Sequence, residues 1–218
     1  MPDIAFINGR FLPWGEATVS IDDRGFQFGD AVYEVIRTYR GAPFEFDAHL
    51  ARLNRSVGEL SLRQPYTREQ WTRWIQQGLS LAGYQDAKIY IQITRGVAPR
   101  EHSFPADILP TVVMTIREFH PLAPDVRRTG VSACTSEDLR WGRCDIKSVN
   151  LLANVLAREE AKKAGVFEAI LVRDGFVMEG ALSNVMAIQD GVVMTAPEGP
   201  RILSACRRRC RNSSREES

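Results

Sequence analysis

One lysine lies between a strand-like stretch and an apolar helical run. It is Lys147, in the octapeptide RCDIKSVN. Most lysines near the start of a helix are solvated surface charges, and spacing alone favours that interpretation. A lysine amine shielded from water can instead attack a carbonyl compound, because the neutral amine is a nucleophile. The other polar residues of the chain bear on which interpretation holds.

Three further groups of residues could act together with such an amine. Glu179 ends a hairpin-like strand just before a glycine, where a carboxylate can face a pocket and the backbone can approach closely. Tyr33 begins a strand after the compact turn GFQFGD, and Arg100 and His102 share a loop bounded by prolines. Taken singly, each has an ordinary structural explanation. Taken together with Lys147, they could handle an amino acid and a carbonyl cofactor.

Composition and charge argue against several classes of function. The 28 basic and 27 acidic residues nearly cancel, which gives no electrostatic case for binding nucleic acid or an anionic membrane. The chain starts without a basic segment and a long apolar run, so we expect no signal peptide, no membrane span and a cytoplasmic location. Cys206 and Cys210 lack a downstream histidine, and we expect no metal site.

The first 120 residues have the pattern of a small α+β domain. Asn8-Gly9 and Arg40-Gly41 are turn signals between alternating segments and predict two hairpins. Asp47 is the expected N-cap of one helix, and Thr67 opens a second with a capping box. The predicted strands are Ile4 to Pro13 around its turn, Ala31 to Tyr39 with a return through Phe46, AKIYIQITRG and TVVMTIREF.

The stretch HPLAPD disfavours a helix because of its two prolines, and we interpret residues 121–126 as an interdomain linker. Residues 127–203 then form a second domain. Its predicted elements are a strand from Val131 to Ser136, a helix from Ser148 to Ala164 with Leu152, Val155 and Leu156 on one face, and hairpins turning at Asp174-Gly175 and Asp190-Gly191. Residues 204–218 are rich in arginine and poor in apolar residues, and we expect disorder there.

Four separated segments resemble the class IV (fold type IV) pyridoxal-phosphate aminotransferases, and most closely their D-amino-acid branch. The segments are RGFQFGDAVYEVIRTYRGAPFEFDAHLARL, ITRGVAPREHSFP, LRWGRCDIKSVNLLANVLA and EAILVRDGFVMEGALSNV, in family order between about Ile4 and Leu203. The resemblance implies a two-domain α+β fold. A small N-terminal α/β sandwich would cover residues 1–120, and a larger β-barrel-like domain, incomplete in this chain, would follow the linker.

The resemblance also implies an activity. It is the transfer of an amino group from a D-amino acid such as D-alanine to a 2-oxo acid such as 2-oxoglutarate, with pyridoxal 5′-phosphate as cofactor. Lys147 matches the lysine that holds this cofactor as a Schiff base and later carries a proton. Glu179 matches the carboxylate that pairs with the pyridine nitrogen and keeps it protonated.

Other site residues follow from the same resemblance. Arg52 matches an arginine that binds the cofactor phosphate, while Arg140 and Ser183 match residues of the cofactor pocket. The substrate side of the site would consist of Tyr33, Arg100 and His102, which hold the carboxylate, and Val35, which lines the same pocket. In the D-specific enzymes the Arg-x-His loop comes from the partner subunit, so the resemblance implies a homodimer.

Two departures from the family pattern are visible. Ala181 and Leu182 replace small hydroxyl residues, and Ala205 to Arg208 replaces a Gly-[Ile/Val]-Thr-Arg stretch whose backbone binds phosphate. The chain also ends several elements early, which we interpret as a truncation or a shifted reading frame that weakens cofactor binding. The alternatives are an L-branched-chain aminotransferase, an aminodeoxychorismate lyase of the same fold, and a non-catalytic remnant.

Overall fold

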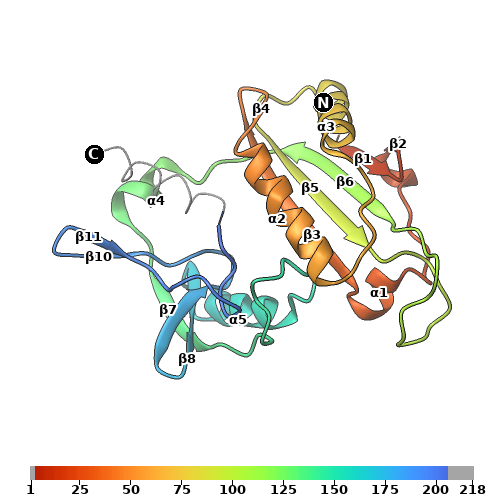
Figure 1. The fold of residues 1–218 in the computed structure, drawn as a ribbon. Coiled ribbons are helices and arrows are strands. Elements are labelled where there is room, and N and C mark those ends of the chain that lie inside the picture. The colour runs from red at the N-terminus through yellow and green to blue at the C-terminus, as the bar shows by residue number, and fades with distance from the viewer. Residues whose placement is uncertain (1–2, 206–218) are drawn as a thin grey trace, which may run out of the picture. The chain divides into compact units, whose positions relative to one another are not determined.

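The computed structural model describes residues 3–205 of the 218-residue chain (Figure 1). Residue contacts divide the chain into two compact units. The first unit comprises Met1–His120 together with Lys147–Val149, and the second comprises Pro121–Ile146 with the chain from Asn150 onward. Most of the segment expected to be disordered, 204–218, lies outside the described residues, as do Cys206 and Cys210.

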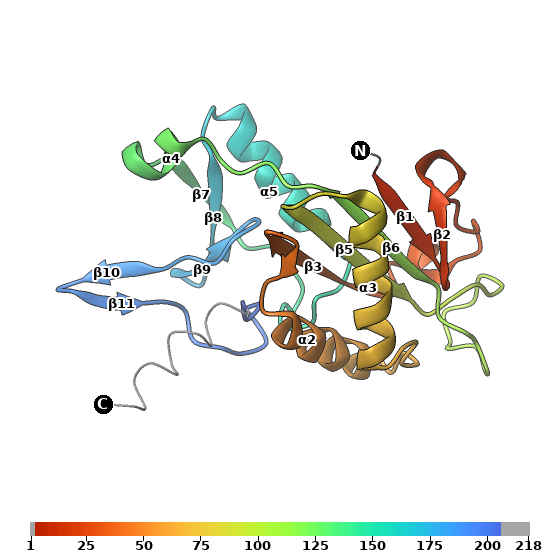
Figure 2. The ribbon, with the colours of Figure 1, turned by 90° about the horizontal axis from the view of Figure 1, so that it is seen from above.

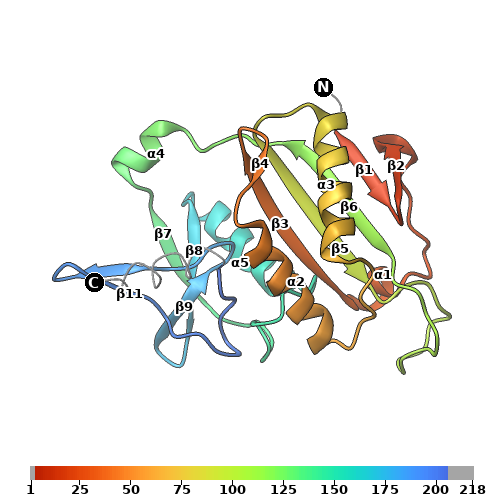
Figure 3. The same ribbon diagram turned by 45° about the horizontal axis from the view of Figure 1, so that its top comes forward.

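A six-stranded antiparallel sheet forms the first unit, in the order β2-β1-β6-β5-β3-β4. Two helices, α2 and α3, pack against one face of this sheet (Figures 2 and 3). The strands are β1 (Ile4–Ile7), β2 (Arg10–Pro13), β3 (Ala31–Tyr39), β4 (Ala42–Pro43), β5 (Ala87–Thr94) and β6 (Val112–Glu118). The helical elements are η1 (Trp14–Glu16), α1 (Arg24–Phe28), α2 (Phe46–Glu59) and α3 (Arg68–Ala82).

Most local turn and capping signals of this unit are confirmed, but not the N-cap of α2. Asn8 and Gly9 have positive φ angles of 48° and 92°, as a two-residue hairpin turn requires. Thr67 and Gln70 form the expected capping box of α3. The expected N-cap of α2 is wrong: Glu45, at a φ of 49°, precedes the helix and makes no side-chain cap bond. The return strand β4 is also shorter than expected, because α2 already begins at Phe46.

The strands of the second unit form a three-stranded sheet, which includes the β8–β9 hairpin, and a separate two-stranded hairpin. The sheet has the order β7-β8-β9, in which β7 and β8 are parallel and β9 is antiparallel. The elements are α4 (Pro124–Thr129), β7 (Ala133–Glu137), α5 (Leu152–Lys163), β8 (Glu168–Arg173), β9 (Phe176–Gly180), β10 (Ala187–Gln189) and β11 (Val192–Met194). Both hairpins turn at the expected Asp-Gly pairs, where Asp174 and Asp190 have positive φ.

Three expectations about this unit are wrong. The proline-rich stretch contains the start of α4, because Pro124 occupies the first turn, where a missing N–H costs nothing. Helix α5 starts at Leu152 instead of Ser148. Its large apolar residues do not form its buried face: Leu152 is 71% exposed, whereas Ala157 and Ala161 are buried against Ala169 and Leu171 of β8. Small side chains allow this close approach of helix and strand. Among the described residues, no helix is long and apolar enough to cross a membrane.

A buried carboxylate joins β3 to α2 in the first unit. Glu34 has a fully buried side chain, and its two oxygens accept hydrogen bonds from Nε and Nη2 of Arg52 at 2.6 and 2.8 Å. Nδ1 of His49 lies 2.8 Å from the same carboxylate. Burial on its own would raise the pKa of Glu34, but the bonds from Arg52 and His49 and the charges of Arg52 and Lys147 outweigh it and lower the pKa. Glu34 of β3 is therefore an anion that binds two side chains of α2.

We expect Glu34→Gln to lower the free energy of unfolding by about 3 to 5 kcal/mol at neutral pH, because it leaves Arg52 buried beside a neutral group. A carboxyl whose pKa is lowered in the folded state stabilises the fold above its ordinary value, here 4.5, and loses that contribution as the pH falls through the lowered pKa. The difference between wild type and variant should therefore shrink below this value. Urea unfolding at about pH 7 and about pH 3 measures it.

The control is Asp47→Asn, which removes an exposed ion pair with Arg68 and should change stability little at either pH. If Glu34→Gln destabilised the protein equally at both pH values, the charge of Glu34 would not be the cause.

Candidate active site

Lys147 lies beside the edge of strand β3. The N–H of Tyr33 donates to the carbonyl of Lys147 at 2.9 Å, and the N–H of Val149 donates to the carbonyl of Ala31 at 3.1 Å. The N–H of Lys147 donates to Oγ of Ser56 on α2 at 3.2 Å. This segment is therefore extended, not the first turn of a helix, and it belongs to the first unit by its contacts. Backbone pairing therefore fixes the position of the Lys147 backbone, from which the side chain extends.

The amine of Lys147 lies against an aromatic pair. Its Nζ is 4.2 Å from the centroid of the Tyr33 ring, and that ring stacks on Tyr90 at 5.7 Å. The negative face of the ring attracts the charged amine and so orients it. Burial, together with the neighbouring Tyr33, raises the pKa of Tyr90 to about 12, so Tyr90 stays a neutral phenol that donates to Gln92. Val35, two residues beyond Tyr33, lies on the same face of β3.

The loop with Arg100 and His102 also belongs to the first unit. The Arg100 guanidinium lies over the ring of Phe28 at 4.8 Å, and the His102 ring contacts that same ring at 5.3 Å. Phe28 is the last residue of α1, which continues directly toward β3 and Tyr33. A short stretch of sequence thus carries both Tyr33 and the ring against which Arg100 and His102 lie.

Glu179 lies in a buried polar cluster of the second unit. It is 5% exposed at the end of β9. Its carboxylate accepts hydrogen bonds from Nη1 of Arg140, from Nδ2 of Asn184 at 2.9 Å and from the N–H of Leu203 at 3.3 Å. Burial raises the pKa of Glu179 above its ordinary value, and the charge of Arg140 offsets part of that rise. Donors on both oxygens fit an ionised carboxylate, which accepts hydrogen bonds only.

Arg140 is bound from two sides. Its Nε and Nη2 donate to Asp138 at 2.8 and 2.9 Å, while its Nη1 donates to Glu179. Arg173 also contacts Asp138, at 3.1 Å. Burial would raise the pKa of Asp138, but bonds from Arg140 and the charges of both arginines lower it. Asp138 therefore holds Arg140 in place against Glu179.

Gly180, which follows Glu179, lies close to Ser183. A Cβ on Gly180 would lie 2.3 Å from Oγ of Ser183, so that the serine side chain would have to move. The Gly180 N–H donates to the Ser183 carbonyl at 2.7 Å, and Ser183 Oγ donates to Glu168 at 3.0 Å. The glycine therefore permits the close backbone approach expected from the sequence. Leu182, which replaces a hydroxyl residue of the family pattern, is 72% exposed.

The sequence pattern did not predict several residues of these clusters. Glu34 and His49 are two of them, although Glu34 binds both His49 and Arg52. Asp138 and Asn184, which surround Arg140 and Glu179, were not singled out either. One signal was available for Glu34, since it is the only charged residue in the buried register of β3, and buried carboxylates require partners. The other residues gave no signal of spacing or periodicity.

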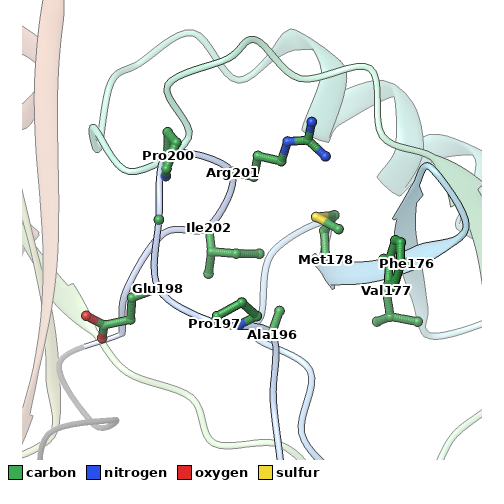
Figure 4. Close-up of a pocket in the computed structure, with 10 residues that line it drawn as sticks. Phe176, Val177, Met178, Ala196, Pro197, Glu198, Pro200, Arg201 and Ile202 are labelled. Carbon is green, nitrogen blue, oxygen red and sulfur yellow. The ribbon is translucent and has the colours of Figure 1, made fainter.

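An apolar pocket in the second unit contains none of the predicted site residues (Figure 4). It lies between β9 and the segment that precedes Leu203. The lining residues are Phe176, Val177, Met178, Ala196, Pro197, Glu198, Gly199, Pro200, Arg201 and Ile202. The predicted site residues lie instead on and beside β3, where residues 147–149 pair with it, and around Glu179.

Known proteins similar to this chain are aminotransferases. The family profile described as Amino-transferase class IV matches residues 31–214. A D-alanine aminotransferase of Staphylococcus haemolyticus is 46% identical over 204 residues, which is 94% of this chain and 72% of the relative. That of Bacillus licheniformis is 43% identical, with 92% and 71% coverage. The chain thus spans roughly seven tenths of the length of these curated relatives.

Solved structures share the fold. The branched-chain amino acid aminotransferase of Escherichia coli superposes with a TM-score of 0.89 at 23% identity, over 100% of this chain and 75% of the other. At that identity the likeness shows the fold alone. A further branched-chain aminotransferase, with a TM-score of 0.86 at 25% identity, was solved with pyridoxamine 5′-phosphate. The chain covers 74% of that structure, which covers 98% of this chain. By its family profile and its curated relatives, this chain belongs to the class IV aminotransferases, the pyridoxal-phosphate enzymes of fold type IV.

Proposed function

We propose that this aminotransferase takes its amino group from a D-amino acid such as D-alanine and passes it to a 2-oxo acid such as 2-oxoglutarate. The observation that carries the proposal is the 42–46% identity to D-alanine aminotransferases over more than nine tenths of the chain. Branched-chain enzymes share the fold at only 22–25% identity. The pair Arg100 and His102 supports the same choice, because a cation and a directional donor suit a substrate carboxylate.

The residues present fit pyridoxal phosphate. When bound, the cofactor supplies an electron-withdrawing ring that stabilises the negative charge developing at the α-carbon of the substrate. Glu179 is a buried acceptor, which suits a protonated ring nitrogen, and Lys147 offers an amine at a fixed position. We assign the phosphate to Arg52, whose guanidinium Glu34 holds from one side, and the wall of the pocket to Ser183 and Arg140.

The protein's own groups would divide the work as follows. Nζ of Lys147 holds the cofactor and, once released, accepts the α-proton of the substrate and returns it. Arg100, His102 and Tyr33 fix the substrate carboxylate, and Val35 lines the same pocket. A fixed carboxylate decides which face of the α-carbon presents its hydrogen to Lys147, so the carboxylate-binding residues set the stereochemistry.

We propose further that the protein works as a cytoplasmic homodimer in which the loop with Arg100 and His102 serves the site of the partner. Exposed apolar residues on that loop support this assembly: Phe104 is 62% and Leu109 is 67% exposed. Two of the cysteines, Cys134 and Cys144, are free thiols, which suits a reducing compartment.

Amino-donor specificity tests the proposal directly. We expect D-alanine with 2-oxoglutarate to give pyruvate, and L-leucine to give no turnover. Lys147→Ala should reduce the rate by roughly a thousand-fold or more and abolish the visible absorption band of the lysine-bound cofactor, because the variant lacks the amine that forms the Schiff base. Turnover of L-leucine alone would assign the chain to the branched-chain class. A protein without the absorption band would not be a working aminotransferase.

A second prediction concerns Glu179. We expect Glu179→Gln to lower kcat on the order of 100-fold, because a neutral amide cannot keep the ring nitrogen protonated. The absorption spectrum of the bound cofactor should shift in the same variant. Glu137→Gln, at an exposed position of β7 in the same unit, is the matched control and should leave both unchanged. An unchanged rate in Glu179→Gln would remove Glu179 from the site.

A further inference from the structure

An aspartate whose side chain is 11% exposed binds two buried arginines at the base of the loop 96–110. Asp30 accepts hydrogen bonds from Nε of Arg24 at 2.9 Å and from Nε and Nη2 of Arg95 at 2.7 and 3.0 Å. Arg24 is only 3% and Arg95 only 5% exposed. Arginines this deeply buried need partners for several donors, and one aspartate cannot satisfy all of them.

The remaining donors of Arg24 bind the loop itself. Its Nη1 donates to the carbonyl of Glu101, and its Nη2 donates to the carbonyl of His102 at 3.4 Å. The same guanidinium lies 4.7 Å from the centroid of the Phe28 ring. Arg100 lies over this ring as well, at 4.8 Å. Arg24 therefore binds the carbonyls of two successive loop residues, Glu101 and His102. It also contacts the Phe28 ring, against which Arg100 rests.

Arg95 fixes the other arm of the loop. Its guanidinium carbon lies 3.5 Å from the centroid of the Phe104 ring, and its Nη1 and Nη2 donate to the carbonyls of Ser61 and Leu60. The loop is also pinched at its ends, because a Cβ on Gly96 would lie 2.0 Å from the carbonyl oxygen of Leu109. Backbone bonds tie residues 96–98 to residues 22–24, and beyond them the loop has no strand or helix, so its contacts with the Arg24 and Arg95 side chains hold it there.

The chemistry of a guanidinium explains why an arginine occupies position 24. Its planar fork can donate to Asp30 with one nitrogen and to two carbonyls with the others, whereas an ammonium is a compact point charge that cannot span these acceptors. The shared anion Asp30 keeps the fork in one orientation. The position of residues 101–102 is thereby tied to a rigid buried ion cluster instead of depending on a flexible surface loop.

We infer that Arg24, oriented by Asp30, is a positioning residue for substrate carboxylate binding: it sets the place of Arg100 and His102. This inference rests on the proposed function, in which those two residues bind the carboxylate. A preorganised loop strengthens binding of the substrate, and its loss raises KM more than it lowers kcat.

The test replaces Arg24 by lysine in the holoenzyme. Arg24→Lys should raise KM for D-alanine about 10-fold or more, change kcat by less than about 3-fold, and leave the Kd of pyridoxal phosphate unchanged. Hydrogen–deuterium exchange should quicken in residues 97–106 only. The matched control is Arg37→Lys, since Arg37 also pairs with an aspartate and lies over two aromatic rings of the same unit. It should alter neither KM nor exchange in the loop.

Two more variants separate the possible outcomes. Arg100→Ala tests the proposed function: an unchanged KM for D-alanine would show that Arg100 does not bind the carboxylate. Phe28→Leu removes the ring that Arg100 and Arg24 both contact but keeps the hydrogen bonds of Arg24 to Asp30 and to the loop carbonyls. It should raise KM in the same way even if Arg24→Lys fails to fold.

Combining Arg24→Lys, or Phe28→Leu, with Arg100→Ala should raise KM by less than the product of the two separate effects, because both changes act in part through Arg100. If Arg100→Ala raises KM while Arg24→Lys and Phe28→Leu do not, the positioning role is overturned and the carboxylate site stands.

Discussion

Two backbone hydrogen bonds attach residues 147–149 to the edge of β3, and the position of the Lys147 amine depends on them. That edge is open because β4 pairs only with Thr38 and Tyr39, at the far end of the strand. An unpaired strand edge presents donors and acceptors that must be satisfied. Here a segment from a distant part of the sequence satisfies them, and its side chain is held beside Tyr33 as a result. The lysine is thus placed by the sheet more than by the helix that follows it.

Strand alternation then assigns different roles to neighbouring residues of β3. Tyr33 and Val35 point to one face, where the amine of Lys147 lies against the Tyr33 ring. Glu34 points to the other face and binds Arg52 of α2. A slip of one residue in register would move Tyr33 and Val35 to the face of Glu34, and Glu34 to theirs. Pairing of β3 with β5 along nearly its whole length fixes the register. The same strand therefore orients a phenol on one side and a guanidinium on the other.

The sequence predicted the features that depend only on residues close together in the chain. Asp-Gly and Asn-Gly turns, the capping box of α3 and the alternation of β3 and β5 need only neighbours along the chain. It failed where partners are distant. Residues 148–151 fit a helical pattern, yet Ser148 pairs with β3 and α5 begins only at Leu152, which fits an apolar face that α5 does not bury. The family resemblance identified Arg140 but not Asp138, since a pattern match names residues and does not name what holds them.

Two buried ion clusters, one in each unit, follow the same physical rule. In each, an aspartate binds two arginines: Asp30 binds Arg24 and Arg95, and Asp138 binds Arg140 and Arg173. Both aspartates use the fork geometry of a guanidinium, which donates in two directions at once. The donors left over are directed at groups assigned to function, namely the loop carbonyls of Glu101 and His102 in one case and Glu179 in the other. Each cluster therefore holds two guanidinium charges against one aspartate, and the remaining positive charge is directed at the loop carbonyls in the first unit and at the Glu179 carboxylate in the second. In the second unit Arg140 thus both fixes the place of Glu179 and offsets part of the rise that burial causes in its pKa.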